Sequence, residues 1–281
     1  MTSSLLLSAV TFIYLLTAVL YLCYFVFKVR FLGRLGTWVA IVGFAVNTLG
    51  IILRWTESYE MGIGHAPLSN LYESLVFFSW TIILLYLLVE WRYGFKSIGA
   101  FATPFAFLAM AYASFSSTAS GIQPLIPALK SNWLIAHVAT CFLGYSAFAV
   151  SCGISVMYLL KRKGGKQREN GVWGLVPKPA VLDDISYRMV LIGFLMLSVG
   201  IITGAVWAHS AWGTYWSWDP KETWSLITWF VYAAFLHARL VRGWEGKRVA
   251  ILSIVGFTCV LFTYFGVNFL LRGLHSYGSM S

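Results

Sequence analysis

Long apolar runs occupy most of this chain of 281 residues. An α-helix needs roughly 20 apolar residues to cross the ~30 Å hydrocarbon core of a membrane. Eight runs are close to that length or longer, at about 5–27, 37–53, 70–90, 98–115, 132–160, 187–207, 221–241 and 249–272. Only 11% of the residues are charged and 59% are hydrophobic, more apolar than a soluble domain requires. The sequence therefore predicts an all-α polytopic membrane protein of about eight transmembrane helices, folded as one membrane domain over residues 1–281.

The distribution of basic residues predicts the orientation of these helices. Segments 28–36, 91–97, 161–188 and 239–248 are rich in Lys and Arg, whereas the other connections and the tail hold only four of the 20, namely Arg54, Lys130, Lys221 and Arg272. Because cytoplasmic loops carry the excess of basic residues, the rich set is predicted to be cytoplasmic, or stromal in a plastid. The loop 161–186 is then cytoplasmic, and both termini are extracytoplasmic.

The net charge of +10 follows mainly from this topology. The basic run from Lys161 to Arg168 indicates contact with anionic lipid headgroups, and we expect no nucleic-acid partner. The amino-terminal run has no basic leading region and no small-residue cleavage pattern, so it is predicted to be a retained transmembrane helix rather than a signal peptide.

A Trp-rich segment, residues 207–229, lies between the sixth and seventh runs on the extracytoplasmic side. Single indoles at helix ends are typical of membrane interfaces, but six of the chain's 13 Trp fall within these 23 residues. Such a cluster predicts a flat apolar platform for a planar ligand such as a porphyrin, built from Trp207, Trp212, Trp216, Trp218 and Trp224. A platform of indoles offers no iron ligand, so any iron must be held from elsewhere.

Two histidines are predicted to lie at the level of this platform. His137 follows the start of the fifth helix by about one and a half turns, with Cys141 below it on the same face, and His275 lies just beyond the last run. Two neutral imidazoles can occupy both axial positions of a haem iron, and Arg272 is placed to meet a propionate. His209, on the same side, competes for either axial position, and His65 is predicted to be exposed in an outer loop.

His237 is predicted to lie deep in the membrane. A rise of ~1.5 Å per residue from Pro220 places it ~26 Å below the outer surface. A histidine at that depth is costly unless it is paired or binds a metal, which makes it a functional candidate. The alternative is a ring that donates to a backbone carbonyl near the cytoplasmic headgroups.

Local patterns also predict helix starts and the role of the cysteines. Asn70 with Glu73 predicts the cap of the third helix, Ser131 or Asn132 the cap of the fifth, and Asp219 with Pro220 and Glu222 the start of the seventh. The four Cys lie inside predicted helices without a C-x-x-C pair, so we expect structural thiols with no redox role.

The segment WAHSAWGTYWSWDPKETWSLITWFVYAAFLHAR resembles the "WWD" signature of the haem-handling proteins of cytochrome c biogenesis, specifically the CcsA or ResC type of System II. The stretches APLSNLYESLVFFSW, LIPALKSNWLIAHV, LDDISYRMVLIGF and VNFLLRGLHSYG resemble the same family in the same order. The resemblance implies that His137 and His275 ligate haem at the outer surface and that His237 belongs to a haem site within the membrane. His65 and His209 match no ligand of that family.

The resemblance further implies a subunit of a cytochrome c synthase, or haem lyase, that carries haem b across the membrane and presents it to the CxxCH segment of apocytochrome c. Such a chain acts by positioning its cargo rather than by a general acid or nucleophile, and capping explains Asp219 and Glu222 better than proton transfer. The implied partners are a CcsB, Ccs1 or ResB subunit that supplies another haem ligand, apocytochrome c and proteins of a thiol-reducing pathway. The implied location is a bacterial inner membrane or a thylakoid membrane.

Two other functions are compatible with a polytopic, His-containing chain. A b-type cytochrome in quinone-linked electron transfer pairs its ligands on facing helices inside the bilayer, whereas two of the three candidates here lie at the outer surface. A transporter of haem or another solute, with no role in attachment, predicts broken helices and polar residues at mid-membrane, which this sequence hardly supplies.

Overall fold

The computed structural model describes residues 3–115, 121–125, 130–163 and 172–271. Within these ranges the chain is helical and contains no strand. The main helices are α1 (Ser3–Phe27), α2 (Arg30–Glu60), α3 (Leu71–Tyr93), α4 (Gly99–Phe115), α5 (Asn132–Lys163), α6 (Pro179–Trp212), α7 (Pro220–Arg242) and α8 (Lys247–Leu261). Short turns of helix complete it, at η1 (Lys96–Ile98), η4 (Val172–Leu175), η5 (Phe262–Gly266) and α9 (Val267–Leu270).

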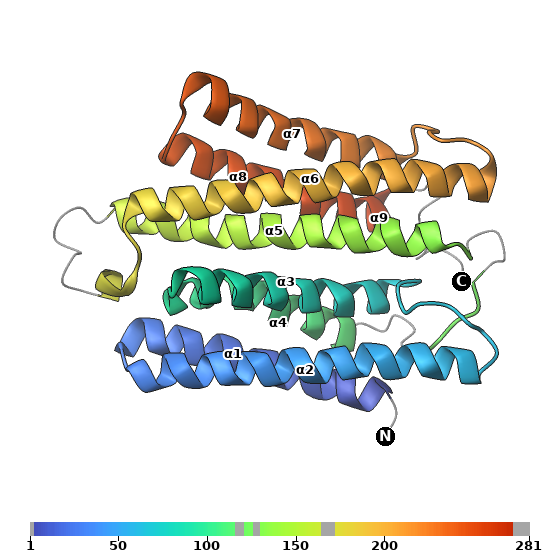
Figure 1. Cartoon of the computed structure of the whole chain (residues 1–281), viewed down its shortest axis with the longest axis horizontal. Helices are drawn as coiled ribbons and strands as arrows, with labels where there is room; N and C mark the ends of the chain where they lie inside the picture. Colours follow the sequence, from blue (N-terminus) through green and yellow to red (C-terminus); the bar gives the residue numbers. More distant parts are fainter. Residues whose placement is uncertain (1–2, 116–120, 126–129, 164–171, 272–281) are drawn as a thin grey trace.

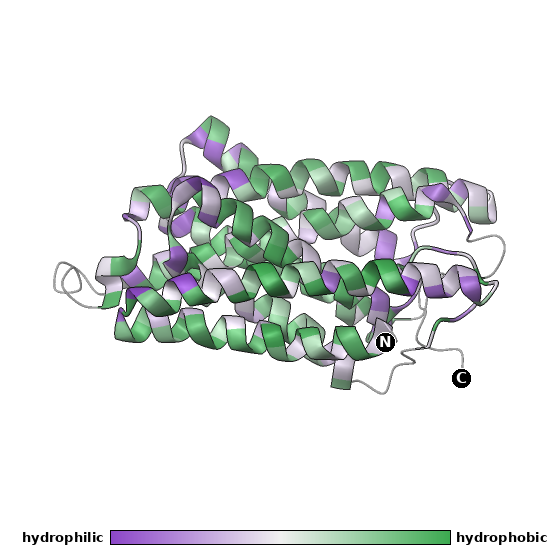
Figure 2. Ribbon diagram, turned by 60° about the horizontal axis from the view of Figure 1, so that its bottom comes forward, coloured by the Kyte–Doolittle hydropathy of each residue, from purple (hydrophilic) through white to green (hydrophobic). Residues whose placement is uncertain are grey.

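Eight helical segments are long and apolar enough to cross a membrane, which confirms the predicted fold class. All eight run along the long axis of the molecule (Figure 1), and hydrophilic residues gather towards the two ends of the bundle (Figure 2). The start of α1 and the end of α9 lie towards the end that also holds the α2–α3 and α6–α7 connections (Figure 1). This end, which carries the Trp-rich segment, is called the Trp-rich end below.

The predicted lengths of two helices were wrong. α2 covers Arg30–Glu60 instead of 37–53, and α6 begins at Pro179 instead of 187 and continues to Trp212 instead of 207. An apolar run marks only the part of a helix that crosses the hydrocarbon, whereas backbone hydrogen bonds continue through the polar turns beyond it. As a result α5 and α6 extend into the predicted loop 161–186, and Trp207 and Trp212 belong to a helix.

The predicted caps are confirmed. The side chain of Asn70 accepts from Glu73 N, and Asp219 and Glu222 form a complete capping box at the start of α7. At α5, Ser131 and not Asn132 is the capping residue, because its Oγ accepts from Trp133 N at 3.2 Å. These caps fix where α3, α5 and α7 begin at the Trp-rich end.

The central helix of the bundle is α5, which packs against α6, α8, α3 and α4. Its closest approach is to α6, where small residues let the two backbones come together. A Cβ on Gly144 would lie 3.0 Å from the carbonyl oxygen of Gly193, and a Cβ on Gly193 would lie 2.5 Å from the ring of Phe148. The face of α5 that carries His137, Cys141, Gly144 and Phe148 is thus the α5–α6 interface.

Candidate functional site

His137 lies half-buried at this interface, near the Trp-rich end. Its Nδ1 lies 2.7 Å from the carbonyl oxygen of Gly200 on α6. A carbonyl can only accept, so Nδ1 carries the proton and the ring's lone pair is on Nε2. A histidine that ligates a metal commonly donates its other N–H in this way, because the hydrogen bond fixes both tautomer and ring orientation.

Two glycines of α6 make room for this arrangement. A Cβ on Gly204 would lie 2.6 Å from Nδ1 of His137, and a Cβ on Gly200 would lie 2.5 Å from Sγ of Cys141. The Cys141 thiol itself is 3.7 Å from Nδ1 of His137. Any larger residue at position 204 would displace the imidazole, so the small residues of α6 provide the space that the ring occupies.

Trp207 supports the other side of His137. The two rings are nearly parallel, with centroids 6.1 Å apart and an angle of 14° between planes. Trp207 is only 1% exposed and packs with Leu134, and Trp212 meets it edge-on at 5.3 Å. Trp207 is therefore a buried indole that packs beside the imidazole of His137.

The other indoles of the Trp-rich segment have different surroundings. Trp216 and Trp218 meet edge-to-face at 5.7 Å, and Trp218 is 67% exposed. Trp224 lies 4.1 Å from the ring of Phe262, and Trp229 donates to Ser198 Oγ between α7 and α6. Since the close Trp pairs cross at large angles, these indoles present separate surfaces, and the haem platform stays a prediction.

Trp218 also has an unusual backbone. Its φ of 58° is in the left-handed region, which a residue with a Cβ seldom adopts. The next residue, Asp219, opens the capping box of α7, so the turn is held from its far side. Such conformations persist where the surrounding structure fixes them, and they concentrate at functional sites.

His237 lies on the outer face of α7 and is exposed. The same face carries Phe230, 57% exposed, and Val241, 70% exposed. Within the described residues no group hydrogen bonds the His237 ring, so the carbonyl alternative finds no support there. The ring points away from the bundle.

The remaining histidines and Arg272 fall into three groups. His275 and Arg272 lie outside the described residues. His209 is exposed and its ring stacks on Tyr215 at 4.2 Å. The prediction that His65 is exposed was wrong, because it is 8% exposed and both ring nitrogens meet carbonyl oxygens.

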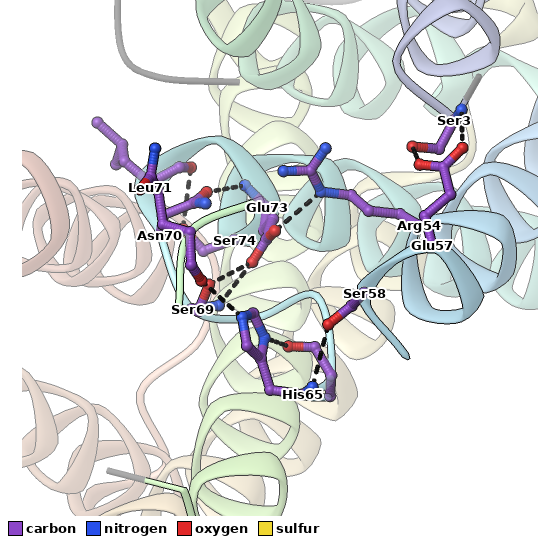
Figure 3. Close-up of polar contacts among 12 residues, drawn as sticks. Ser3, Arg54, Glu57, Ser58, His65, Ser69, Asn70, Leu71, Glu73 and Ser74 are labelled. Carbon is purple, nitrogen blue, oxygen red and sulfur yellow. Dashed lines mark hydrogen bonds and ion pairs between the residues drawn. The ribbon is translucent and has the colours of Figure 1, made fainter. Parts of the chain in front are cut away.

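The sequence-based reasoning missed a buried ion pair at the Trp-rich end (Figure 3). Arg54 Nε donates to Glu73 at 2.8 Å, and the side chains are 4% and 0% exposed. The other carboxylate oxygen of Glu73 accepts from the backbone N–H and hydroxyl of Ser69. Glu73 therefore joins α2 to α3 in addition to its part in the cap of α3. The sequence feature that could have predicted this ion pair is one acidic and one basic residue inside predicted membrane helices.

Lys221 was also missed as a site residue. It occupies the first turn of α7, and its Nζ donates to Asn268 Oδ1 of α9 at 3.1 Å. Asn268 in turn donates to the Tyr264 carbonyl, and the Tyr264 hydroxyl meets Ser74 of α3 at 2.5 Å. This polar chain links α7, the last helix and α3 beneath the Trp-rich segment.

Comparison with known proteins gives a consistent family. Residues 68–275 match the family of cytochrome C assembly proteins. The chain is 44% identical to the cytochrome c biogenesis protein CcsA of Parasynechococcus marenigrum, over 82% of each chain. It is 42% identical to the protein of that name from Guillardia theta, over 83% of each chain.

A solved structure shares the fold. The cytochrome c haem lyase CcmF superposes with a TM-score of 0.71 over 97% of this chain and 48% of that one, at 19% identity. The family match and the relatives together show that the chain belongs to the cytochrome C assembly protein family, as a protein of the CcsA type with a role in cytochrome c biogenesis.

Proposed function

We propose that the chain carries haem b as cargo and presents it at the Trp-rich end for covalent attachment to apocytochrome c. The observation that carries this proposal is the setting of His137. Its Nδ1 proton is held by Gly200, its ring lies along Trp207, and Gly204 leaves it space. An imidazole that donates through Nδ1 in this tautomer can bind iron through Nε2.

In the proposal His275 supplies the second axial ligand of this outer site, and Arg272 meets a propionate. The exposed indole of Trp218 and its neighbour Trp216 offer apolar surface to the porphyrin. Bis-His ligation and apolar cover would protect the iron until a histidine of the substrate replaces one ligand. By the distribution of Lys and Arg, this end is extracytoplasmic, periplasmic or lumenal, and the α5–α6 connection is cytoplasmic.

His237 belongs to a second, inner site, for which this chain supplies one of the two iron ligands. Its ring is directed out of the bundle, among Phe230 and Val241, so a second ligand must come from another chain. A membrane partner of the CcsB type, placed against α7, would supply it and enclose the haem. Haem made inside would enter there and pass outward to His137.

Attachment needs little chemistry from this chain. Each thiol of a reduced CxxCH segment adds across one vinyl group of the haem, with sulfur bonding to one carbon and the proton to the other, so no electrons are exchanged. Asp219 and Glu222 are occupied by backbone N–H groups of the capping box. The contribution of the chain is therefore to position the vinyl edge, as part of a haem lyase complex supplied with reduced thiols.

The proposal is tested by purifying the full-length chain with its partner and recording the haem spectrum. His137→Ala and His275→Ala should each remove the outer-site signal and stop attachment to an apocytochrome c. His209→Ala is the matched control, because this histidine is exposed at the same end but stacks on Tyr215. Unchanged spectra in both ligand variants would refute the outer site.

A further inference from the structure

The α2–α3 turn is organised around Ser58. Its carbonyl oxygen accepts from the backbone N–H of Ile63 and Gly64, both at 3.0 Å, and its hydroxyl accepts from His65 N at 3.1 Å. Gly62 and Gly64 have φ values of 71° and 63°, which let the chain reverse tightly. The turn therefore fixes the backbone of His65 and directs its ring into the protein (Figure 3).

The ring of His65 joins two connections that are distant in sequence. Its Nδ1 lies 2.8 Å from the Ala66 carbonyl of its own turn, and its Nε2 lies 2.9 Å from the Gln123 carbonyl of the α4–α5 connection. Lys130, later in that connection, donates to the Ile63 carbonyl at 2.6 Å. The α2–α3 turn thus holds the α4–α5 connection at two points, just before α5 begins.

The connection held in this way also supports Trp207. Leu125 follows Gln123 by two residues and packs against the cluster of Leu134 and Trp207. Trp207 in turn stacks on His137. His65 therefore contacts the connection at Gln123, the connection contacts the cluster of Leu134 and Trp207 through Leu125, and Trp207 contacts His137.

We propose that His65 is a positioning residue for the outer site. With its proton on Nε2, the ring donates to the Gln123 carbonyl and holds the α4–α5 connection instead of binding iron. The connection keeps Leu125 against Trp207, and Trp207 keeps the ring of His137 in place. These contacts alone show how His65 holds the connection, whereas the consequence for haem rests on the proposed function.

The connection can be probed with trypsin, because the chain carries its own cleavage site at Lys130. Full-length protein in lipid nanodiscs is digested, and the rate of cut after Lys130 is followed by mass spectrometry. His65→Leu should accelerate this cut about five-fold, the effect of losing roughly one hydrogen bond that holds the segment. His65→Gln keeps an N–H donor at this position and should restore part of the protection of Lys130 from trypsin. This variant also keeps the test valid if His65→Leu fails to fold.

Glu57→Gln is the matched control. Glu57 accepts from the backbone N–H of Ser3 at 2.8 Å and from its hydroxyl, so the variant weakens a contact at the same end (Figure 3) that leads to neither Gln123 nor Trp207. It should leave the cut after Lys130 unchanged. An unchanged rate in His65→Leu, or the same acceleration in Glu57→Gln, would overturn the role of His65 in holding the connection.

The effect on the site is measured on the same samples. The outer-site haem signal, defined as the part that His137→Ala removes, should fall several-fold in His65→Leu and recover partly in His65→Gln. Faster cleavage with an undiminished outer-site signal would overturn the positioning role. If His137→Ala removes no haem at all, the proposed function fails, and the cleavage rates still decide whether His65 holds the connection.

Discussion

His137 and His237 are in opposite surroundings within one bundle. His137 is enclosed by α5 and α6, with a carbonyl on Nδ1 and an indole along its ring, whereas His237 is exposed on α7 beside Phe230 and Val241. The first ring is ordered by the chain itself, so the entropy of fixing it is lost on folding rather than on binding. The second is ordered only when something else covers α7.

This difference suits the two histidines to different roles in the proposed function. A proposed site that releases its cargo to a passing substrate benefits from a ligand that stays in place when empty. A proposed site at the entry of a pathway can be completed by the partner, which makes loading depend on assembly. The following predictions test whether the contrast between the ordered and the incomplete ligand is real.

The largest effect is expected from filling the space beside His137. Gly204→Val would place side-chain atoms where Nδ1 now lies, because even a Cβ there would be 2.6 Å away. We expect outer-site haem affinity to fall about 10–100-fold, as when the supporting contacts of a metal ligand are removed. Ile202→Ala, on an exposed position of the same helix, is the control and should bind like the wild type in a haem titration.

One turn away, the expected effect is on stability and not on haem affinity. Gly200→Ala should lower the free energy of unfolding by about 1–3 kcal/mol, because its Cβ would lie 2.5 Å from Sγ of Cys141. Cys141→Ala combined with Gly200→Ala should recover part of that loss. A double-mutant cycle from thermal unfolding in detergent measures the coupling, and strictly additive effects would show that α5 and α6 are less tightly packed than described.

The backbone of Trp218 gives a third comparison within the Trp-rich end. Both Trp218→Gly and Trp218→Ala remove the indole, but only Gly adopts a φ of 58° without steric cost. The Gly variant should therefore be more stable than the Ala variant by about 1 kcal/mol, measured as a difference in unfolding free energy. Haem binding should fall equally in the two variants, and equal stability would mean that the turn relaxes without strain.

The smallest effect is expected at His237 in the chain without its partner. There His237→Ala should leave haem content unchanged, since the inner site is incomplete. In the complex the same substitution should lower haem to roughly half, the share of one of two sites. Phe230→Ala is the control on the same face. A loss of haem from the isolated chain in His237→Ala would contradict the proposed difference between His237 and His137.

Much of the fold could be predicted because its causes are local. Apolar runs predicted eight membrane helices, and the Asn70 and Asp219 patterns predicted the starts of α3 and α7. Helix lengths were less accurate, since α2 and α6 continue through charged turns that hydropathy excludes. All four cysteines lie in helices as free thiols.

The surroundings of the site residues could not be predicted in the same way. The sequence marked His137 and His237 equally as candidates and placed His65 in an exposed loop. The structure encloses the first, exposes the second and buries the third. Nothing in the sequence indicated that Trp207 would stack on His137 or that Leu125 would pack against the cluster of Leu134 and Trp207.

Taken alone, the sequence determined how many times the chain crosses the membrane and which residues gather at each end, because hydropathy and capping depend on neighbours along the chain. The tertiary structure decided which helix faces meet, and with them whether a histidine is held, exposed or used as a link. That choice depends on the rotation and pairing of α5, α6 and α7, set by close packing between residues far apart in sequence.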